Sequence, residues 1–346
     1  MAGDGRGLTP RLWGTGAGLL LSLLLSGCEQ RIETLSGPTM GSQYSLKYVV
    51  ADGVPAPQRV QAEVRQLLDE VDRQMSTWRA DSDLSRFNQL PAGACQAMPA
   101  PVLALVRFGE GLSQDSDGAF DLTLEPLLDL WGFGPQSRDQ QVPSAEQIAA
   151  ARSRVGHQHL RLEGERLCKD VALQLDLNSI AAGDTVDRLG ERLQALGIRS
   201  YVLDITGEVK AVGRKPDGSP WRVALEAPRD DRQAAQRILA LDGLAVSTSG
   251  DYRNYFERDG QRFSHTLDPQ TGAPIRHPLA AVTVVDASAL RADGLSTLLM
   301  VLGPERGLAF AEQAGIMAFF VSRSGQGFVA HGTSFFNLRF GEGARP

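Results

Sequence analysis

The segment Ala292-Asp293-Gly294-Leu295-Ser296-Thr297 places a carboxylate and a hydroxyl four residues apart. Leucines recur beside it at helical spacing, so we expect a helix that begins here with an exposed first turn. Residues four apart share one helical face, and Asp293 with Thr297 could form an oxygen clamp for Mg²⁺, completed by substrate phosphates and water. The same residues could be an N-capping aspartate and a threonine bonded back to its own helix. Position alone leaves both interpretations open.

A second polar group is Asp176-Leu177-Asn178-Ser179. The sequence predicts a strand over 171–177, a turn at 181–183 and a helix beginning at Asp184. A strand-to-helix junction directs backbone N–H groups and the positive end of a helix toward one point, which suits a phosphate or a metal-bridged phosphate. Most such junctions bind nothing, so this signal is weak by itself.

His265 lies at the end of an expected strand, before the turn at Asp268-Pro269. Imidazole can act as a general base near neutral pH, although a lone histidine is more often structural. A hydroxyl-rich turn at 246–252 precedes it, and Gly118-Ala119-Phe120-Asp121 combines a turn glycine with a core residue and a carboxylate. We interpret the two histidines at 157 and 159 as structural, because no carboxylate lies near them in the sequence.

The composition narrows the function. Of the 346 residues 42% are hydrophobic and 22% charged, as in an ordinary soluble globule. The net charge is -6 and no basic stripe is present, which excludes nucleic acid as a partner. The mature chain has no P-loop, H-E-x-x-H, G-x-S-x-G or strand-linked G-x-G-x-x-G, so the usual signs of nucleotide hydrolysis, zinc proteolysis, α/β-hydrolase chemistry and Rossmann hydride transfer are missing.

The expected elements indicate an α+β fold with a mixed or antiparallel sheet and helices packed outside it, because strands dominate the middle without β-α-β alternation. We expect helices within 60–75, 102–112, 144–154, 184–196, 295–302 and 308–314. Strands are expected at 42–50, 160–162 with 167, 171–177, 201–205, 209–212, 221–225, 239–246, 262–267, 280–285 and 317–322.

The first 27 residues are typical of a signal peptide, with arginines before an apolar run that is too short to span a membrane. The run ends in Leu25-Ser26-Gly27-Cys28, which resembles a bacterial lipobox. We therefore expect residues 28–346 to form one periplasmic domain, anchored to a membrane by lipid on Cys28. In that oxidising compartment Cys95 and Cys168 could pair, but the sequence does not give their distance.

Six segments, spread from residue 39 to 297, resemble the motifs of the FAD:protein FMN transferases, the ApbE family, in the family's order. They are TMGS (39–42), MSTWR (75–79) with SRFN (85–88), GAFD (118–121), DLNSIAAG (176–183), SHTLDP (264–269) and ADGLST (292–297). The resemblance implies an α+β protein that binds FAD with Mg²⁺ and transfers its FMN half to a Thr or Ser hydroxyl of a target flavoprotein, releasing AMP. A water acceptor would instead make it an FAD pyrophosphatase, and a third reading is a non-catalytic flavin-binding lipoprotein.

The resemblance also assigns residues. Those expected to contact FAD are Met40, Trp78, Ala119, Phe120, Asp121, Asn178, Asp184 and Leu267. The Ala181 carbonyl, Asp293 and Thr297 are implied as metal ligands, with His265 as the first candidate for the general base and Asp293 as the second. The family usually has Ala-Lys-Gly or Gly-Glu-Gly followed by an aromatic residue where this chain has Ala181-Ala182-Gly183-Asp184. That departure bears on FAD contacts rather than on the metal ligands.

Overall fold

The computed structural model describes residues 31–137, 139–229, 235–325 and 327–341, together with Met1 and Gly3. Within them, the largest sheet is antiparallel throughout, in the order β1-β2-β6-β7-β10-β15-β16-β17. Its strands are β1 (Arg31–Thr39), β2 (Ser42–Val50), β6 (Tyr201–Ile205), β7 (Glu208–Val212), β10 (Leu244–Gly250), β15 (Leu279–Asp286), β16 (Met317–Ser324) and β17 (Gly327–Gly332). Helices pack outside it, which confirms the expected α+β class.

Smaller sheets and the helices surround this sheet. The other strands are β3 (Cys95–Ala97), β4 (Leu160–Glu163), β5 (Arg166–Lys169), β8 (Trp221–Glu226), β9 (Ala235–Leu241), β11 (Tyr255–Arg258), β12 (Gln261–Ser264), β13 (Leu267–Asp268) and β14 (Ala273–Pro274). The helices are α1 (Pro57–Met75), α2 (Asp83–Asn88), α3 (Ala100–Asp115), α4 (Glu125–Trp131), α5 (Ala145–Arg152), α6 (Ala181–Ala195), α7 (Ala289–Gln313) and α8 (Ser334–Phe340), with a 3₁₀ turn at His157–His159.

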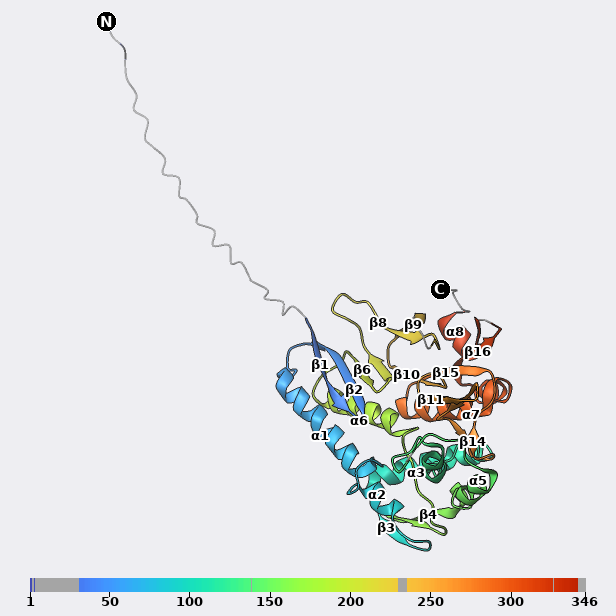
Figure 1. Cartoon of the computed structure of the whole chain (residues 1–346). Helices are drawn as coiled ribbons and strands as arrows, with labels where there is room; N and C mark the ends of the chain where they lie inside the picture. Colours follow the sequence, from blue (N-terminus) through green and yellow to red (C-terminus); the bar gives the residue numbers. More distant parts are fainter. Residues whose placement is uncertain (2, 4–30, 138, 230–234, 326, 342–346) are drawn as a thin grey trace.

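The two faces of the large sheet carry different layers (Figure 1). On one face Leu46 and Leu203 pack against α1 and α6, whose apolar residues recur at helical spacing, and α7 continues this layer over β10 and β15. On the other face Ala281 and Phe319 pack against the β8–β9 ribbon and α8. The sheet is therefore sandwiched at its centre, while the outer face of β2 and β6 is left for the cavity described below.

A small sheet of β3, β5 and β4 braces the segment that leads into α6. Cys95 and Cys168 are register partners in it and form a disulfide, which settles the pairing that the sequence left open. The next residue, Lys169, is fully buried and donates hydrogen bonds to the carbonyls of Phe87 and Leu173 at 2.9 Å. These contacts fix the path of the chain toward Asp176.

Two expectations about this segment are wrong. The residues at 171–177 form no strand, apart from an isolated bridge between Leu124 and Gln174. The Asn88 side chain satisfies both backbone groups of Leu175, so the alternation of buried residues there reflects core packing without a neighbouring strand. The turn expected at 181–183 is instead the first turn of α6, which begins at Ala181 rather than at Asp184.

Three other elements differ in extent. The strand expected over 239–246 is two strands, β9 and β10, because Gly243 turns the chain with φ 69°. The strand expected over 262–267 ends at Ser264, and Leu267 begins β13. The helix expected from Leu295 begins six residues earlier, at Ala289, and continues to Gln313 across a non-helical Gly303. Strand β1 was not expected from the sequence.

Other expectations are confirmed. Helices α1 and α3 contain the expected segments, and Ser144 and Gln147 form the expected capping box of α5. Among the described residues, no helix combines the length and apolar composition needed to cross a bilayer. The expected leader, apart from its residues 1 and 3, and Cys28 lie outside the described residues.

Candidate functional site

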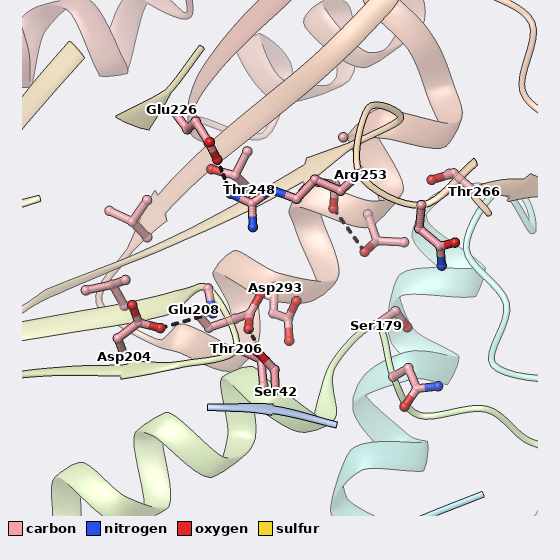
Figure 2. A pocket seen from close by; sticks show the side chains of 18 of the residues that line it. Ser42, Ser179, Asp204, Thr206, Glu208, Glu226, Thr248, Arg253, Thr266 and Asp293 are labelled. Atoms are coloured by element: carbon pink, nitrogen blue, oxygen red, sulfur yellow. Dashed lines mark hydrogen bonds and ion pairs between the residues drawn. The ribbon is translucent and has the colours of Figure 1, made fainter. Parts of the chain in front are cut away.

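A cavity of about 1050 Å³ lies where the open face of the large sheet meets β8, the loop after β10 and the start of α6. Side chains from segments that are far apart in the chain reach it (Figure 2). Eight of the residues singled out in the sequence line it: Ala119, Phe120, Asp121, Asn178, His265, Leu267, Asp293 and Thr297. Its volume is at the upper end of the range for small-molecule sites.

Asp293 joins the two helices beside the cavity. It lies in the second turn of α7, is 5% exposed, and accepts a hydrogen bond from the backbone N–H of Gly183 at 2.9 Å. That N–H is in the first turn of α6, where Ile180 provides no side-chain cap, so Asp293 caps α6 from another helix. The N-cap of α7 itself is Ser288. Both the exposed helix start and the N-cap alternative are therefore wrong for Asp293.

A second carboxylate faces Asp293. Ser247 lies between the two, with its hydroxyl 3.4 Å from Asp293 Oδ1 and 3.5 Å from Glu208 Oε1. Burial raises the pKa of Asp293 well above its usual range, and the nearby Glu208 raises it further. Burial also raises the pKa of Glu208. Two neighbouring acids, Asp293 buried and Glu208 half-buried, disfavour double ionisation unless a cation lies beside them.

Hydroxyl groups complete this corner of the cavity. Ser249 lies 3.3 Å from Thr297 and 2.9 Å from Ser296 between hydroxyl oxygens. The segment expected to be a hydroxyl-rich turn is strand β10, and residues 247 and 249 share the face toward α7 because side chains alternate along a strand. Carboxylate and hydroxyl oxygens are hard ligands, of the type that Mg²⁺ and Ca²⁺ take.

Glu208 is held by a strained turn. Thr206 has φ 56°, which is rare for a β-branched residue, and with Gly207 at φ 115° it forms the tight turn between β6 and β7. The Thr206 hydroxyl donates to Glu208 Oε2 at 2.9 Å (Figure 2). Such strain concentrates at functional sites, and here it aims the carboxylate toward Asp293.

His265 is half-buried and lines the same cavity. Its Nδ1 lies 3.1 Å from the carbonyl oxygen of Asn254. An imidazole that donates from Nδ1 keeps the lone pair on Nε2 free to accept a proton. Burial lowers the pKa of His265 below 6.5, so the ring is neutral at pH 7. The structure therefore gives His265 the protonation state that a general base requires.

Asp121 and Asp176 line the wall near α4. Asp121 accepts bonds from the Thr123 hydroxyl at 2.7 Å and the His157 backbone N–H at 2.9 Å, which ties two loops together. Burial raises the pKa of Asp176 to about 6. Behind it Glu125 is 2% exposed, and its Oε2 has no hydrogen-bond partner among the described residues. Burial and the charges of two aspartates raise the pKa of Glu125 to about 9.

Four of the expected site residues do not line the cavity. Met40 lies 40% exposed in the β1–β2 turn, and Trp78 is 72% exposed after α1. Asp184 lies 3.5 Å from Arg188, and burial raises its pKa to about 6. The Ala181 carbonyl, expected as a metal ligand, accepts the Thr185 hydroxyl at 2.6 Å.

The sequence interpretation missed two residues of the corner around Asp293, namely Glu208 and Ser247. In the sequence, Glu208 lies in the turn between the strands expected at 201–205 and 209–212, and Ser247 lies within the hydroxyl-rich turn expected at 246–252. A usable signal was present in the alternating hydroxyls at 247 and 249, since residues two apart on a strand face one side. The approach of Glu208 to Asp293 follows from sheet order and has no local signal.

Comparisons with known proteins agree on one family. The model of the ApbE family matches residues 40–320. The crystal structure of the flavinyl transferase ApbE of Pseudomonas stutzeri, in its apo form, is similar with a TM-score of 0.86 and 63% identity, covering 91% of this chain and 98% of that one. The FAD:protein FMN transferase of Vibrio cholerae is 45% identical over 91% of this chain and 95% of its own length. That of Escherichia coli K12 is 36% identical, covering 90% and 92%.

Proposed function

This chain belongs to the ApbE family, and we propose that it is a Mg²⁺-dependent enzyme that transfers the FMN half of FAD to a Ser or Thr hydroxyl of a target flavoprotein. FAD:protein FMN transfer is the activity named for its relatives, up to 45% identical over most of the chain. The observation that carries the chemistry is the corner where Asp293, Glu208, Ser247 and Thr297 meet at one end of a large cavity.

The donor set fits Mg²⁺. All side chains at the corner offer oxygen. The raised pKa values of the two carboxyls support a cation site, because a positive charge beside them would favour their ionised forms. Asp293 and Thr297 would hold the ion from the cavity side. The Ala181 carbonyl, implied as the third ligand by the family resemblance, does not line the cavity and would have to share its oxygen with the Thr185 hydroxyl. Mg²⁺ bound there would supply charge neutralisation for a pyrophosphate that is being broken.

The chain's own residues then account for the transfer. The acceptor hydroxyl oxygen forms a bond to the phosphorus of the FMN half, the bond from that phosphorus to the bridging oxygen breaks, and AMP leaves with that oxygen. His265 accepts the hydroxyl proton at Nε2, because its Nδ1 faces the Asn254 carbonyl. Asp293 orients α6 through Gly183, which keeps the backbone N–H groups of that helix fixed beside the cavity.

Mass spectrometry tests this function. A candidate acceptor protein is incubated with the enzyme, FAD and Mg²⁺, and the modified residue is mapped by proteolysis. A gain of one FMN mass on a Ser or Thr, with AMP released, supports the proposal. Release of FMN and AMP without modification would indicate an FAD pyrophosphatase, and bound but intact FAD would indicate a flavin-binding protein. Either result contradicts transfer.

The position of the enzyme in the cell is also a proposal. The lipobox-like sequence before Cys28 supports cleavage after residue 27 and lipid attachment at a bacterial periplasmic membrane. Intact-mass measurement of the membrane-extracted protein should find Cys28 as a lipid-modified N-terminus, and Cys28→Ala should release a soluble or unprocessed form. Recovery of the unaltered protein with residues 1–27 attached would refute this.

A further inference from the structure

The strand β8 offers a free edge to the cavity. Within the described residues it pairs only with β9, in a ribbon that is separate from the large sheet. All residues at 222–226 line the cavity. Because side chains alternate between the two faces of a strand, five successive lining residues mean that the edge itself borders the cavity. Such an edge has unpaired N–H and C=O groups that can bind another strand.

Two cations that line the same cavity have no ion-pair partner in the described part of the chain. Arg222 of β8 and Lys47 of β2 are both exposed and both line the cavity. Arg253, by contrast, is paired with Glu226 (Figure 2). The acidic groups Asp293 and Glu208, together with Asp204, also line the cavity. Arg222, the first residue of this edge, therefore carries a positive charge without an ion-pair partner among the described residues.

The far end of β8 leads to the proposed base. Glu226 is the last residue of β8 and forms an ion pair with Arg253. Asn254 follows Arg253 in the chain, and its carbonyl oxygen accepts the hydrogen bond from His265 Nδ1. A strand that runs along β8 thus passes from Arg222 toward His265. The two ends of this edge, residues 222 and 226, are four residue steps apart, which is about 13 Å at about 3.3 Å per residue.

We propose that the free edge of β8 binds an extended segment of the acceptor protein as an added strand, with an acidic side chain near Arg222 and Lys47 and the acceptor hydroxyl near His265. The proposal rests on the proposed function, since it assigns the place of the second substrate. Backbone pairing tolerates different side chains, so it suits an enzyme that modifies a segment of another protein. The spacing along β8 places the acidic residue about four or more residues from the modified hydroxyl.

Steady-state kinetics test the charge contact. The probe is a synthetic peptide copied from the site that the mass mapping identifies, and the variants are Arg222→Glu and, as a matched control, Arg65→Glu on the exposed side of α1. We expect Arg222→Glu to raise the KM for the peptide about 10-fold or more while the KM for FAD is unchanged. A peptide whose acidic residue is changed to Lys should restore most of the lost affinity of the Arg222→Glu variant. The same peptide should not improve the KM of the wild-type enzyme or of the Arg65→Glu control.

A backbone scan tests the strand pairing. Single N-methyl groups are placed on successive peptide amides, because a strand bound at one edge uses every second N–H. Transfer should fall at alternate positions. A KM change for FAD in Arg222→Glu, or a scan without alternation, would overturn the docking site while the wild-type enzyme still transfers FMN. Absence of any FMN mass with the wild-type enzyme would overturn the proposed function, and this inference with it.

Discussion

Replacing Gly183 by Ala should disturb the contact between α6 and α7 that positions Asp293. A methyl group at this position would lie 2.5 Å from the carbonyl oxygen of Ala289 and 2.8 Å from Asp293 Cβ. Ordinary contacts are about 3.5 Å, so the helices must separate by roughly 0.5–1 Å. The hydrogen bond from Gly183 N–H to Asp293, now 2.9 Å, would lengthen with them.

Two effects on stability oppose each other. Alanine favours a helix interior by about 1 kcal/mol over glycine, whereas overpacking against backbone costs about 1–3 kcal/mol. Because the nearest atoms belong to the backbone of α7, relief by side-chain rotation is not available, and we expect a net loss of about 1–2 kcal/mol in the free energy of unfolding. Gly111→Ala on α3 is the matched control, since no atom lies within 4 Å of its added methyl group. It should be neutral or stabilising by up to about 1 kcal/mol.

The assays are urea unfolding of both variants and FMN transfer as a function of Mg²⁺ concentration. Loss of a charge-assisted hydrogen bond is worth about 1.5–3 kcal/mol, so the Mg²⁺ concentration for half-maximal activity should rise about 10-fold or more in Gly183→Ala. Gly111→Ala should leave it unchanged. A Gly183→Ala enzyme that is as stable as wild type and has an unchanged Mg²⁺ midpoint would refute this account of the helix contact.

Three further predictions concern ionisable groups. The folded pKa of Glu125, about 9, lies above the ordinary value of 4.5, so the unfolded chain releases this proton first and wild-type stability falls as pH rises between these values. Glu125→Gln should remove a loss of about 4 kcal/mol between pH 5 and pH 8 in unfolding measurements, and parallel pH curves would contradict this. His265→Ala should bind FAD normally but transfer FMN about 10²-fold more slowly, and the wild-type rate should fall only below pH 6.5; weaker FAD binding at an unchanged rate would assign His265 to binding. Asp293→Asn should raise the Mg²⁺ concentration needed for half-maximal activity more than Thr297→Ala does, as measured by Mg²⁺ titration. Full activity of Asp293→Asn at limiting Mg²⁺ would exclude Asp293 and Thr297 as the metal ligands.

The sequence predicted an element correctly where that element depends on residues close together in the chain. The apolar spacing in α1 and the Ser144 capping box were visible because helix faces and caps involve residues three or four apart. The hairpin of β4 and β5 was visible in its turn residues. The motif order was enough to indicate the family and eight residues that line the cavity.

Where the sequence failed, the partner was distant in the chain. The alternating residues at 171–177 predict a strand, but Asn88 takes the hydrogen bonds that another strand would supply. Gly183 suggests a turn, but it lies inside α6 because only glycine allows α7 to approach so closely. A local pattern records what a segment buries and does not record against which segment it packs.

The amino-acid sequence by itself determined the α+β class, the family motifs and the presence of Asp293, Thr297 and His265 as reactive groups. Only the tertiary structure decided how deeply these groups are buried and which protonation state each of them favours. Asp293 is buried beside Glu208 because sheet order brings β7 and β10 against α7, and this burial raises its pKa. Burial of the ring lowers the pKa of His265, and this outweighs the hydrogen bond to the Asn254 carbonyl, which raises it. Charge and hydration depend on surroundings in three dimensions, and these are set by contacts between residues far apart in the chain.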